Sequence, residues 1–158
     1  MVLQHALAFA PSTVQTSHKK ILILAEGSLV RHNFKNILHK EGYTVHVVSS
    51  IGQAMAVFSK FHPDIVISDI FVPGKYDSVV DGITFIEFVK QAAPKTITIL
   101  MSATATNAFH PSGLPAADAT LSTQSDEHPY AQLLHIIHVL DRRQHEQQIE
   151  GTIEGARP

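Results

Sequence analysis

Short runs of apolar residues alternate along this chain with longer stretches in which apolar residues recur every three or four positions. The short runs have the length of buried strands, and the longer stretches have the period of amphipathic helices. The runs expected to form strands cover residues 21–24, 43–48, 65–69, 97–101 and 118–121. Because strands alternate with helices, the sequence predicts one α/β domain with a parallel sheet that helices cover on both faces.

Local signals mark where the predicted helices begin and end. Ser28 is placed to cap the first helix, and Gly42 ends it. Ser50 leads into a second helix, and a third amphipathic helix contains residues 83–89. The last helix is expected over residues 130–143, where apolar residues recur at helical spacing.

The stretch between the fourth and fifth predicted strands departs from this pattern. A helix is expected over residues 105–117, but the stretch contains Pro111, Gly113 and Pro115. Each proline inside a helix removes a hydrogen bond and clashes with the preceding turn, which costs about 3 kcal/mol. The sequence therefore predicts that the fourth helix is short or broken.

The two ends of the chain differ from the part between them. Residues 1–18 contain scattered apolar residues, without the basic start and the long apolar run of a signal peptide, and are expected to form an N-terminal arm. Residues 144–158 are mostly polar and are expected to form a C-terminal tail. This leaves residues 19–143 as the predicted domain.

The composition excludes several classes of function. Hydrophobic residues make up 44% of the chain, which is enough to build a core. The formal net charge is −2 and no basic stripe is present, so we expect no direct binding to nucleic acid. No stretch approaches the ~20 apolar residues that span a membrane, so we expect no membrane contact. The absence of cysteine excludes disulfides and thiol chemistry and favours the cytoplasm.

Polar residues follow four of the predicted strands. They are Glu26, Asp69, Ser102 and Thr123. In open parallel sheets, ligands bind outside the carboxyl ends of the strands, at the point where the strand order reverses. The sequence therefore places a candidate site at this edge of the sheet.

The segments around these residues closely resemble the receiver domain of two-component response regulators, and in particular the chemotaxis type. They read ILILAE at 21–26, PDIVISDIFVPG at 63–74, DG at 81–82 and ILMSA at 99–103. The resemblance covers about residues 19–143. It implies a flavodoxin-like, doubly wound sheet of five parallel strands in the order 2-1-3-4-5.

The resemblance also implies a chemistry. Asp69 matches the aspartate that accepts a phosphoryl group from a histidine kinase or a phosphotransfer protein. In the family a Mg²⁺ ion offsets the charge on the phosphoryl oxygens, and its implied ligands here are Glu26, Asp69 and the backbone carbonyl of Phe71. Ser102 matches the switch hydroxyl that hydrogen-bonds the bound phosphoryl group.

Three positions depart from the family pattern. Ala25 replaces one of two acidic residues, which weakens the expected binding of Mg²⁺. Thr123 stands where the family has a lysine that pairs with the phosphoryl oxygens, and the loss of that contact is expected to cost about 10- to 100-fold. Thr120 stands where the family commonly has a switching aromatic residue.

We predict a receiver domain that does not act as an enzyme. It is expected to change its contacts with a downstream protein when Asp69 is phosphorylated. Whether the chain forms a homodimer is an open question at this point. The departures at Ala25 and Thr123 support an alternative, a pseudo-receiver that binds a partner without phosphorylation. A small α/β phosphatase with an aspartate nucleophile is a further alternative. It needs a second acid where this chain has Phe71, and the chain carries no glycine-rich phosphate loop.

Overall fold

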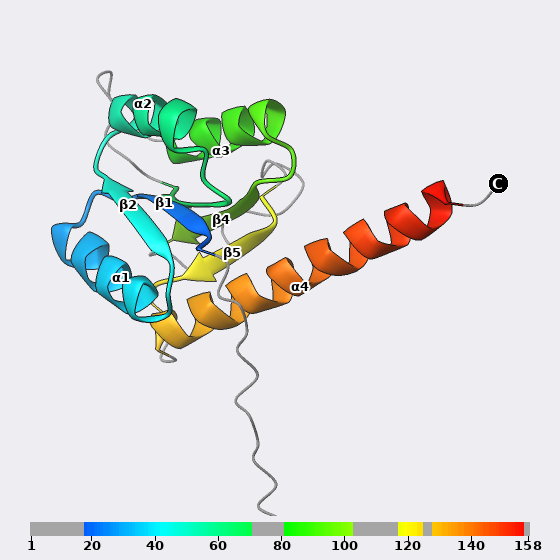
Figure 1. Ribbon diagram of the computed structural model, residues 1–158. Helices are drawn as coiled ribbons and strands as arrows, with labels where there is room; N and C mark the ends of the chain where they lie inside the picture. Colours follow the sequence, from blue (N-terminus) through cyan, green and yellow to red (C-terminus); the bar gives the residue numbers. More distant parts are fainter. Residues whose placement is uncertain (1–17, 71–80, 103–116, 125–127, 157–158) are drawn as a thin grey trace, which may run out of the picture.

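Five parallel strands form one sheet in the part of the chain that the computed structural model describes, residues 18–70, 81–102, 117–124 and 128–156 (Figure 1). The strands are β1 (Lys20–Leu24), β2 (Thr44–Val48), β3 (Ile65–Asp69), β4 (Ile97–Ser102) and β5 (Ala119–Ser122). Their order across the sheet is β2-β1-β3-β4-β5. The predicted flavodoxin-like order is therefore confirmed.

The described residues also form four helices, which lie in two layers on the sheet. The helices are α1 (Ser28–Lys40), α2 (Ile51–Phe61), α3 (Asp81–Ala92) and α4 (Pro129–Gly155). One face of the sheet packs against α1 and α4, and the opposite face packs against α2 and α3 (Figure 1). The broken helix predicted over residues 105–117 and the arm predicted over residues 1–18 lie almost entirely outside the described residues.

Side chains along each inner strand alternate between two hydrophobic cores. In β1, Ile21 and Ile23 pack in the core beneath α1 and α4, whereas Leu22 and Leu24 pack in the core beneath α2 and α3. All four side chains are fully buried. Because both faces of the sheet are covered, such strands are apolar along their length. Polar groups for chemistry are therefore provided at the strand ends and in the loops that follow them.

The start of α1 differs from the sequence prediction. Ser28 is the first residue inside the helix rather than its cap, and the extended residue before it is Gly27, which has no side chain to accept a hydrogen bond. The prediction that Ser28 caps the helix is wrong. At α2, by contrast, Ser50 is the capping residue, and its hydroxyl oxygen accepts a hydrogen bond from the Gln53 amide at 3.3 Å.

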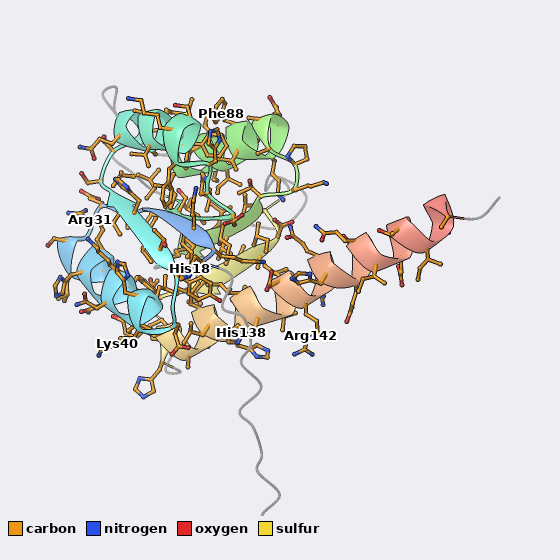
Figure 2. The ribbon with its side chains drawn as sticks, viewed as in Figure 1. His18, Arg31, Lys40, Phe88, His138 and Arg142 are labelled. Atoms are coloured by element: carbon orange, nitrogen blue, oxygen red, sulfur yellow. The ribbon has the colours of Figure 1, made fainter. Side chains whose placement is uncertain are left out.

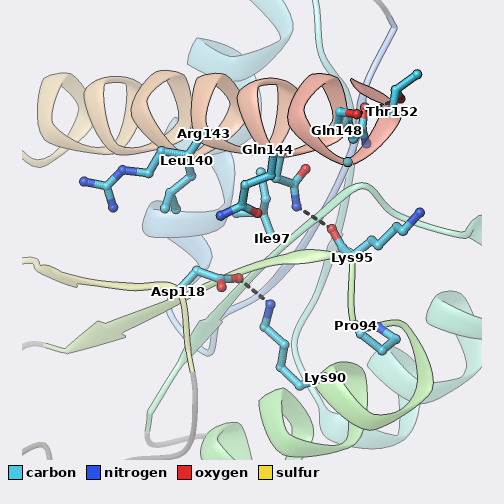
Figure 3. Close-up of a pocket in the computed structure, with 12 residues that line it drawn as sticks. Lys90, Pro94, Lys95, Ile97, Asp118, Leu140, Arg143, Gln144, Gln148 and Thr152 are labelled. Atoms are coloured by element: carbon cyan, nitrogen blue, oxygen red, sulfur yellow. Dashed lines mark hydrogen bonds and ion pairs between the residues drawn. The ribbon is translucent and has the colours of Figure 1, made fainter. Parts of the chain in front are cut away.

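One acidic residue at the amino-terminal edge of the sheet has a structural role. The Asp118 carboxylate accepts hydrogen bonds from the amide of Thr98 at 2.8 Å and from its hydroxyl at 3.2 Å. Lys90 of α3 forms an ion pair with the same carboxylate at 2.6 Å (Figure 3). These contacts join α3, β4 and the residue before β5, at the edge opposite the predicted site.

The last helix extends beyond the body of the domain. Leu133 and Ile137 are buried in the core, and the Gln144 side chain donates a hydrogen bond to the backbone carbonyl of Lys95 at 2.6 Å (Figure 3). From His145 to the end of α4 every residue is exposed, and the helix projects from the domain (Figure 1). Within the described residues, no helix has the length and apolar content needed to cross a membrane.

Candidate functional site

The candidate site lies where the carboxyl ends of β1, β3 and β4 meet. These strands are neighbours in the sheet, and the strand order reverses between β1 and β3. Asp69 is the last residue of β3 and lies in register with Met101 of β4, so Ser102 is one residue further along the adjacent strand. Glu26 follows β1 after a single intervening residue. The topology thus places three of the predicted residues at one edge of the sheet.

The fold brings Glu26 and Asp69 into direct contact although 43 positions separate them in the sequence. The backbone N–H of Glu26 donates a hydrogen bond to Oδ2 of Asp69 at 3.1 Å. Glu26 itself is exposed, whereas Ala25 before it is fully buried. The hydrogen bond from the backbone N–H fixes the orientation of the Asp69 carboxylate. Glu26, the second acidic residue of the site, is exposed to solvent.

The pKa of the Asp69 carboxyl is raised from 3.8 to about 6, chiefly because its burial penalises the charged form. The negative charge of Glu26 raises the pKa further. The hydrogen bond from the Glu26 amide and the positive charge of Arg31 act in the opposite direction. Asp69 is therefore mostly ionised at pH 7, but its ionised form is held in an unfavourable environment.

This raised pKa predicts how stability depends on pH. Between about pH 4 and pH 6 the folded state keeps a proton on Asp69 that the unfolded state has lost, so the free energy of unfolding falls as the pH rises through this range. Asp69→Asn removes the buried charge. We expect this variant to be more stable than the wild type at pH 7.5 by about 1–2 kcal/mol, an amount reduced for the partial exposure of the group.

The measurement is urea unfolding of both proteins at several pH values with a chelator present. The difference between them is expected to shrink toward pH 4. Asp64→Asn serves as a control, because Asp64 is exposed and accepts a hydrogen bond from the Lys20 amide at the other edge of the sheet. A difference that does not change with pH contradicts the assignment to Asp69.

The donor set at this edge fits a hard divalent cation. Glu26 and Asp69 offer carboxylate oxygens, which are the ligands that Mg²⁺ prefers, and Mg²⁺ is commonly held by one or two carboxylates with water in the remaining positions. Among the described residues, no group of three or more histidine, aspartate or glutamate side chains is placed to hold a metal ion. The third predicted ligand, the carbonyl of Phe71, lies outside the described residues.

Ser102 and Thr123 join the carboxyl ends of the neighbouring strands β4 and β5. Ser102 is buried at the end of β4. Its backbone carbonyl accepts a hydrogen bond from the Thr123 amide at 2.9 Å and another from the Thr123 hydroxyl at 3.2 Å. The side chain at position 123 is thus a neutral group that fixes the turn after β5 to the end of β4.

One residue of the site, Arg31, was not predicted from the sequence. Arg31 lies at the amino-terminal end of α1 (Figure 2), and its Nη1 group donates hydrogen bonds to the carbonyl of Ala25 at 2.6 Å and to the carbonyl of Glu26. Side chains on a helix tilt toward its N-terminus, so a cation one turn into a helix that follows a site strand points back toward that site. A basic residue about one turn into the helix that follows β1 could therefore have been predicted from the sequence to lie near the site, and Arg31 has this position.

Comparison with known proteins decides the family. The sequence model described as "Response regulator receiver domain" matches residues 21–120. The chain belongs to this family. The receiver-domain match includes Glu26, Asp69 and Ser102 and ends within β5, so α4 lies beyond it.

Among curated proteins, this receiver domain is similar to a protein-glutamate methylesterase/protein-glutamine glutaminase 3 of Rhodospirillum rubrum, with 31% identity over 90 residues. The match covers 56% of this chain and 23% of that protein. The chain therefore spans about a quarter of the length of this relative.

Solved structures share the fold. The receiver domain is similar to a CheY-like response regulator receiver domain protein of Methanospirillum hungatei, with a TM-score of 0.67, 25% identity and coverage of 83% of this chain and 99% of that one. It is also similar to the signal receiver domain of an HD domain-containing protein of Pseudomonas fluorescens, with a TM-score of 0.69 and 21% identity over 84% of this chain and 93% of that one. The second likeness shows the fold alone.

Proposed function

We propose that this receiver domain accepts a phosphoryl group on Asp69 from a histidine kinase or a phosphotransfer protein, in two-component signal transduction. The observation that carries the proposal is the position of Asp69, a half-buried carboxylate at the end of β3 whose Oδ2 is held by the Glu26 amide. Such a carboxylate is oriented and partly shielded from water, and part of it stays exposed. Membership of the family supports the same role.

Each residue of the site has a part in the transfer. An oxygen of the Asp69 carboxylate attacks the phosphorus atom, and the bond from phosphorus to the donor breaks with its electron pair on the leaving group. The Glu26 amide holds Oδ2, and the Glu26 and Asp69 carboxylates would hold Mg²⁺, which when bound offsets the negative charge of the phosphoryl oxygens. Ser102, at the end of the next strand, would donate its hydroxyl to those oxygens.

The contacts of Thr123 support a route from the site to a protein partner. The Ser102 carbonyl accepts hydrogen bonds from both the amide and the hydroxyl of Thr123. Movement of Ser102 toward a phosphoryl group would therefore displace Thr123 as well. Thr123 precedes α4, so the position of this helix would change with the state of Asp69. We propose that the downstream partner is a protein that reads this change, and that the chain acts in the cytoplasm as a binding module without turnover.

The test is the intact mass of the protein after incubation with acetyl phosphate, with Mg²⁺ present or with a chelator in its place. We expect one phosphoryl adduct with Mg²⁺ and a much slower reaction without it. No adduct under either condition would overturn the proposal. If Mg²⁺ also fails to bind at millimolar concentration, the result would instead support a pseudo-receiver that binds its partner without phosphorylation.

We also propose that the projecting part of α4 pairs with a second copy of the chain. Ile149 and Ile153 lie one turn apart and are 60% and 59% exposed. Arg142 and Arg143 lie where the helix leaves the domain, and Figure 2 shows Arg142 on the side of α4 away from the sheet. The acidic residues of the segment lie further along it. They are Glu146, Glu150 and Glu154.

An antiparallel pair of these segments would place the acidic end of each helix beside the basic start of the other, as two-fold symmetry allows. The arrangement would also cover the two exposed isoleucines, which together would contribute about 3 kcal/mol or more.

Light scattering across a concentration series tests this pairing. The double variant Ile149→Gln and Ile153→Gln is expected to weaken the dimer at least tenfold, because it removes the apolar contacts. Leu29→Gln is the matched control, since Leu29 is also apolar and 71% exposed but lies on α1. A wild type that stays monomeric at its highest soluble concentration, or a double variant that dimerises equally well, contradicts the proposal.

A further inference from the structure

The charge at the candidate site is unbalanced in the transfer that we propose. Glu26 and Asp69 contribute two carboxylates, and a phosphoryl group brings further negative charge to the same edge of the sheet. Two of the residues beside them, Ser102 and Thr123, are neutral. A divalent cation would offset part of this charge, and a second, permanent positive charge would offset more of it.

Arg31 is a cation fixed at this place by the backbone. Its Nη1 group donates to the carbonyls of Ala25 and Glu26, the two residues that follow β1. The amide of Glu26 is the group that donates to Asp69. The guanidinium is therefore tied to the same peptide segment that orients the Asp69 carboxylate, and its positive charge lowers the pKa of that carboxyl.

The guanidinium also keeps donors for a ligand. Among the described residues, the Nη1 group makes the hydrogen bonds of this side chain, which leaves the Nη2 and Nε groups for other acceptors. A guanidinium presents its donors in a planar fork that suits phosphoryl oxygens and stays charged at any physiological pH. Because Arg31 is half-buried, solvent screens its charge less than the charge of a surface residue.

From these contacts we infer that Arg31 supplies the permanent positive charge for the phosphoryl group on Asp69, and that it positions the Asp69 carboxylate through the Ala25–Glu26 segment. The inference rests on the proposed function. In the step concerned, one oxygen–phosphorus bond forms to Asp69, the phosphorus–oxygen bond of acetyl phosphate breaks, and acetate leaves with the electron pair. No proton and no redox change are required.

Charge and hydrogen bonding at position 31 can be separated by substitution. Arg31→Gln keeps a donor for the backbone carbonyls but removes the charge, whereas Arg31→Lys keeps both the charge and a donor. Lys35→Gln is the matched control, because Lys35 is an exposed cation one turn further along α1. Each protein is incubated with acetyl phosphate and Mg²⁺, and the rate of phosphoryl uptake is followed by intact mass.

We expect Arg31→Gln to take up the phosphoryl group about 10- to 100-fold more slowly than the wild type, the size of one charge-assisted contact. Arg31→Lys is expected to recover most of this loss, and Lys35→Gln to react like the wild type. A purely structural role would not be rescued by charge in this way. Thermal melting of each variant establishes that it is folded, and Arg31→Met replaces Arg31→Gln if the latter is unfolded.

The outcomes separate this inference from the function on which it rests. No adduct on the wild type overturns both. An adduct on the wild type with an equal rate for Arg31→Gln overturns the inference about Arg31 and leaves the phosphoacceptor role of Asp69 standing. Equal slowing of phosphoryl uptake in Arg31→Gln and Arg31→Lys overturns the role of the charge. Arg31→Lys keeps the charge, so the shared loss would then come from the planar fork of the guanidinium, which both variants lack.

Discussion

Replacing Asp69 by asparagine is expected to abolish the phosphoryl adduct. An amide oxygen carries no negative charge and is a poor nucleophile, so the attack on phosphorus loses its reactive group. The substitution also removes one of the two carboxylates proposed to hold Mg²⁺. The side chain keeps its size, and the raised pKa of Asp69 indicates that the fold tolerates a neutral group there. A folded protein without an adduct is therefore the expected result.

Intact mass after incubation with acetyl phosphate and Mg²⁺ measures this effect. Asp64→Asn is the matched control, because it makes the same chemical change at the opposite edge of the sheet, where Asp64 accepts a hydrogen bond from the Lys20 amide at 2.8 Å. The control is expected to react like the wild type. If Asp69→Asn still gains a phosphoryl group, the acceptor is another residue and the proposed site is wrong.

The second large effect is expected from Gly82→Ala. Gly82 is buried in the first turn of α3, and a β-carbon at this position would overlap the backbone carbonyl oxygen of Asp69. It would also lie 2.8 Å from the Asp69 carbonyl carbon and 2.9 Å from the carbonyl oxygen of Ile70. All three atoms belong to the backbone, so no rotation of a side chain relieves the overlap, and α3 must move away from β3.

We expect Gly82→Ala to lower the free energy of unfolding by about 3 kcal/mol, which corresponds to a fall in Tm of roughly 10 °C. Gly52→Ala is the control, because Gly52 is exposed in α2 and a β-carbon there meets nothing within 4 Å. That variant is expected to gain about 0.5–1 kcal/mol from its better helix propensity. Thermal unfolding of both variants is the measurement, and equal stability of the two would contradict the close packing of α3 on β3.

Gly82 also links the fold to the site. Gly82 has no side chain, and the space that a β-carbon would need is occupied by the backbone carbonyl of Asp69. If α3 shifts, the peptide of Asp69, the proposed phosphoacceptor, shifts with it. Among molecules of Gly82→Ala that remain folded, phosphoryl uptake is therefore expected to slow as well, whereas Gly52→Ala is expected to leave it unchanged.

The sequence by itself determined the order of elements and the edge of the sheet that carries the candidate site. Strands buried on both faces must be apolar along their length, so runs such as 21–24 and 65–69 are visible without a structure. Parallel strands bring their carboxyl ends to one edge, which places Glu26, Asp69 and Ser102 together. The start of α1 was less certain in the sequence, because serine is common both as a cap and in the first turn, and here Gly27 precedes the helix.

Only the tertiary structure decided which groups contact each other at that edge. Each of these contacts involves a backbone group. The Glu26 amide donates to the Asp69 carboxylate, the Arg31 guanidinium donates to the carbonyls of Ala25 and Glu26, and the Thr123 hydroxyl donates to the Ser102 carbonyl. Every residue has the same backbone groups, so the sequence carries no signal for such partners. Their identity depends on loop geometry, which is fixed when the helices pack on the sheet.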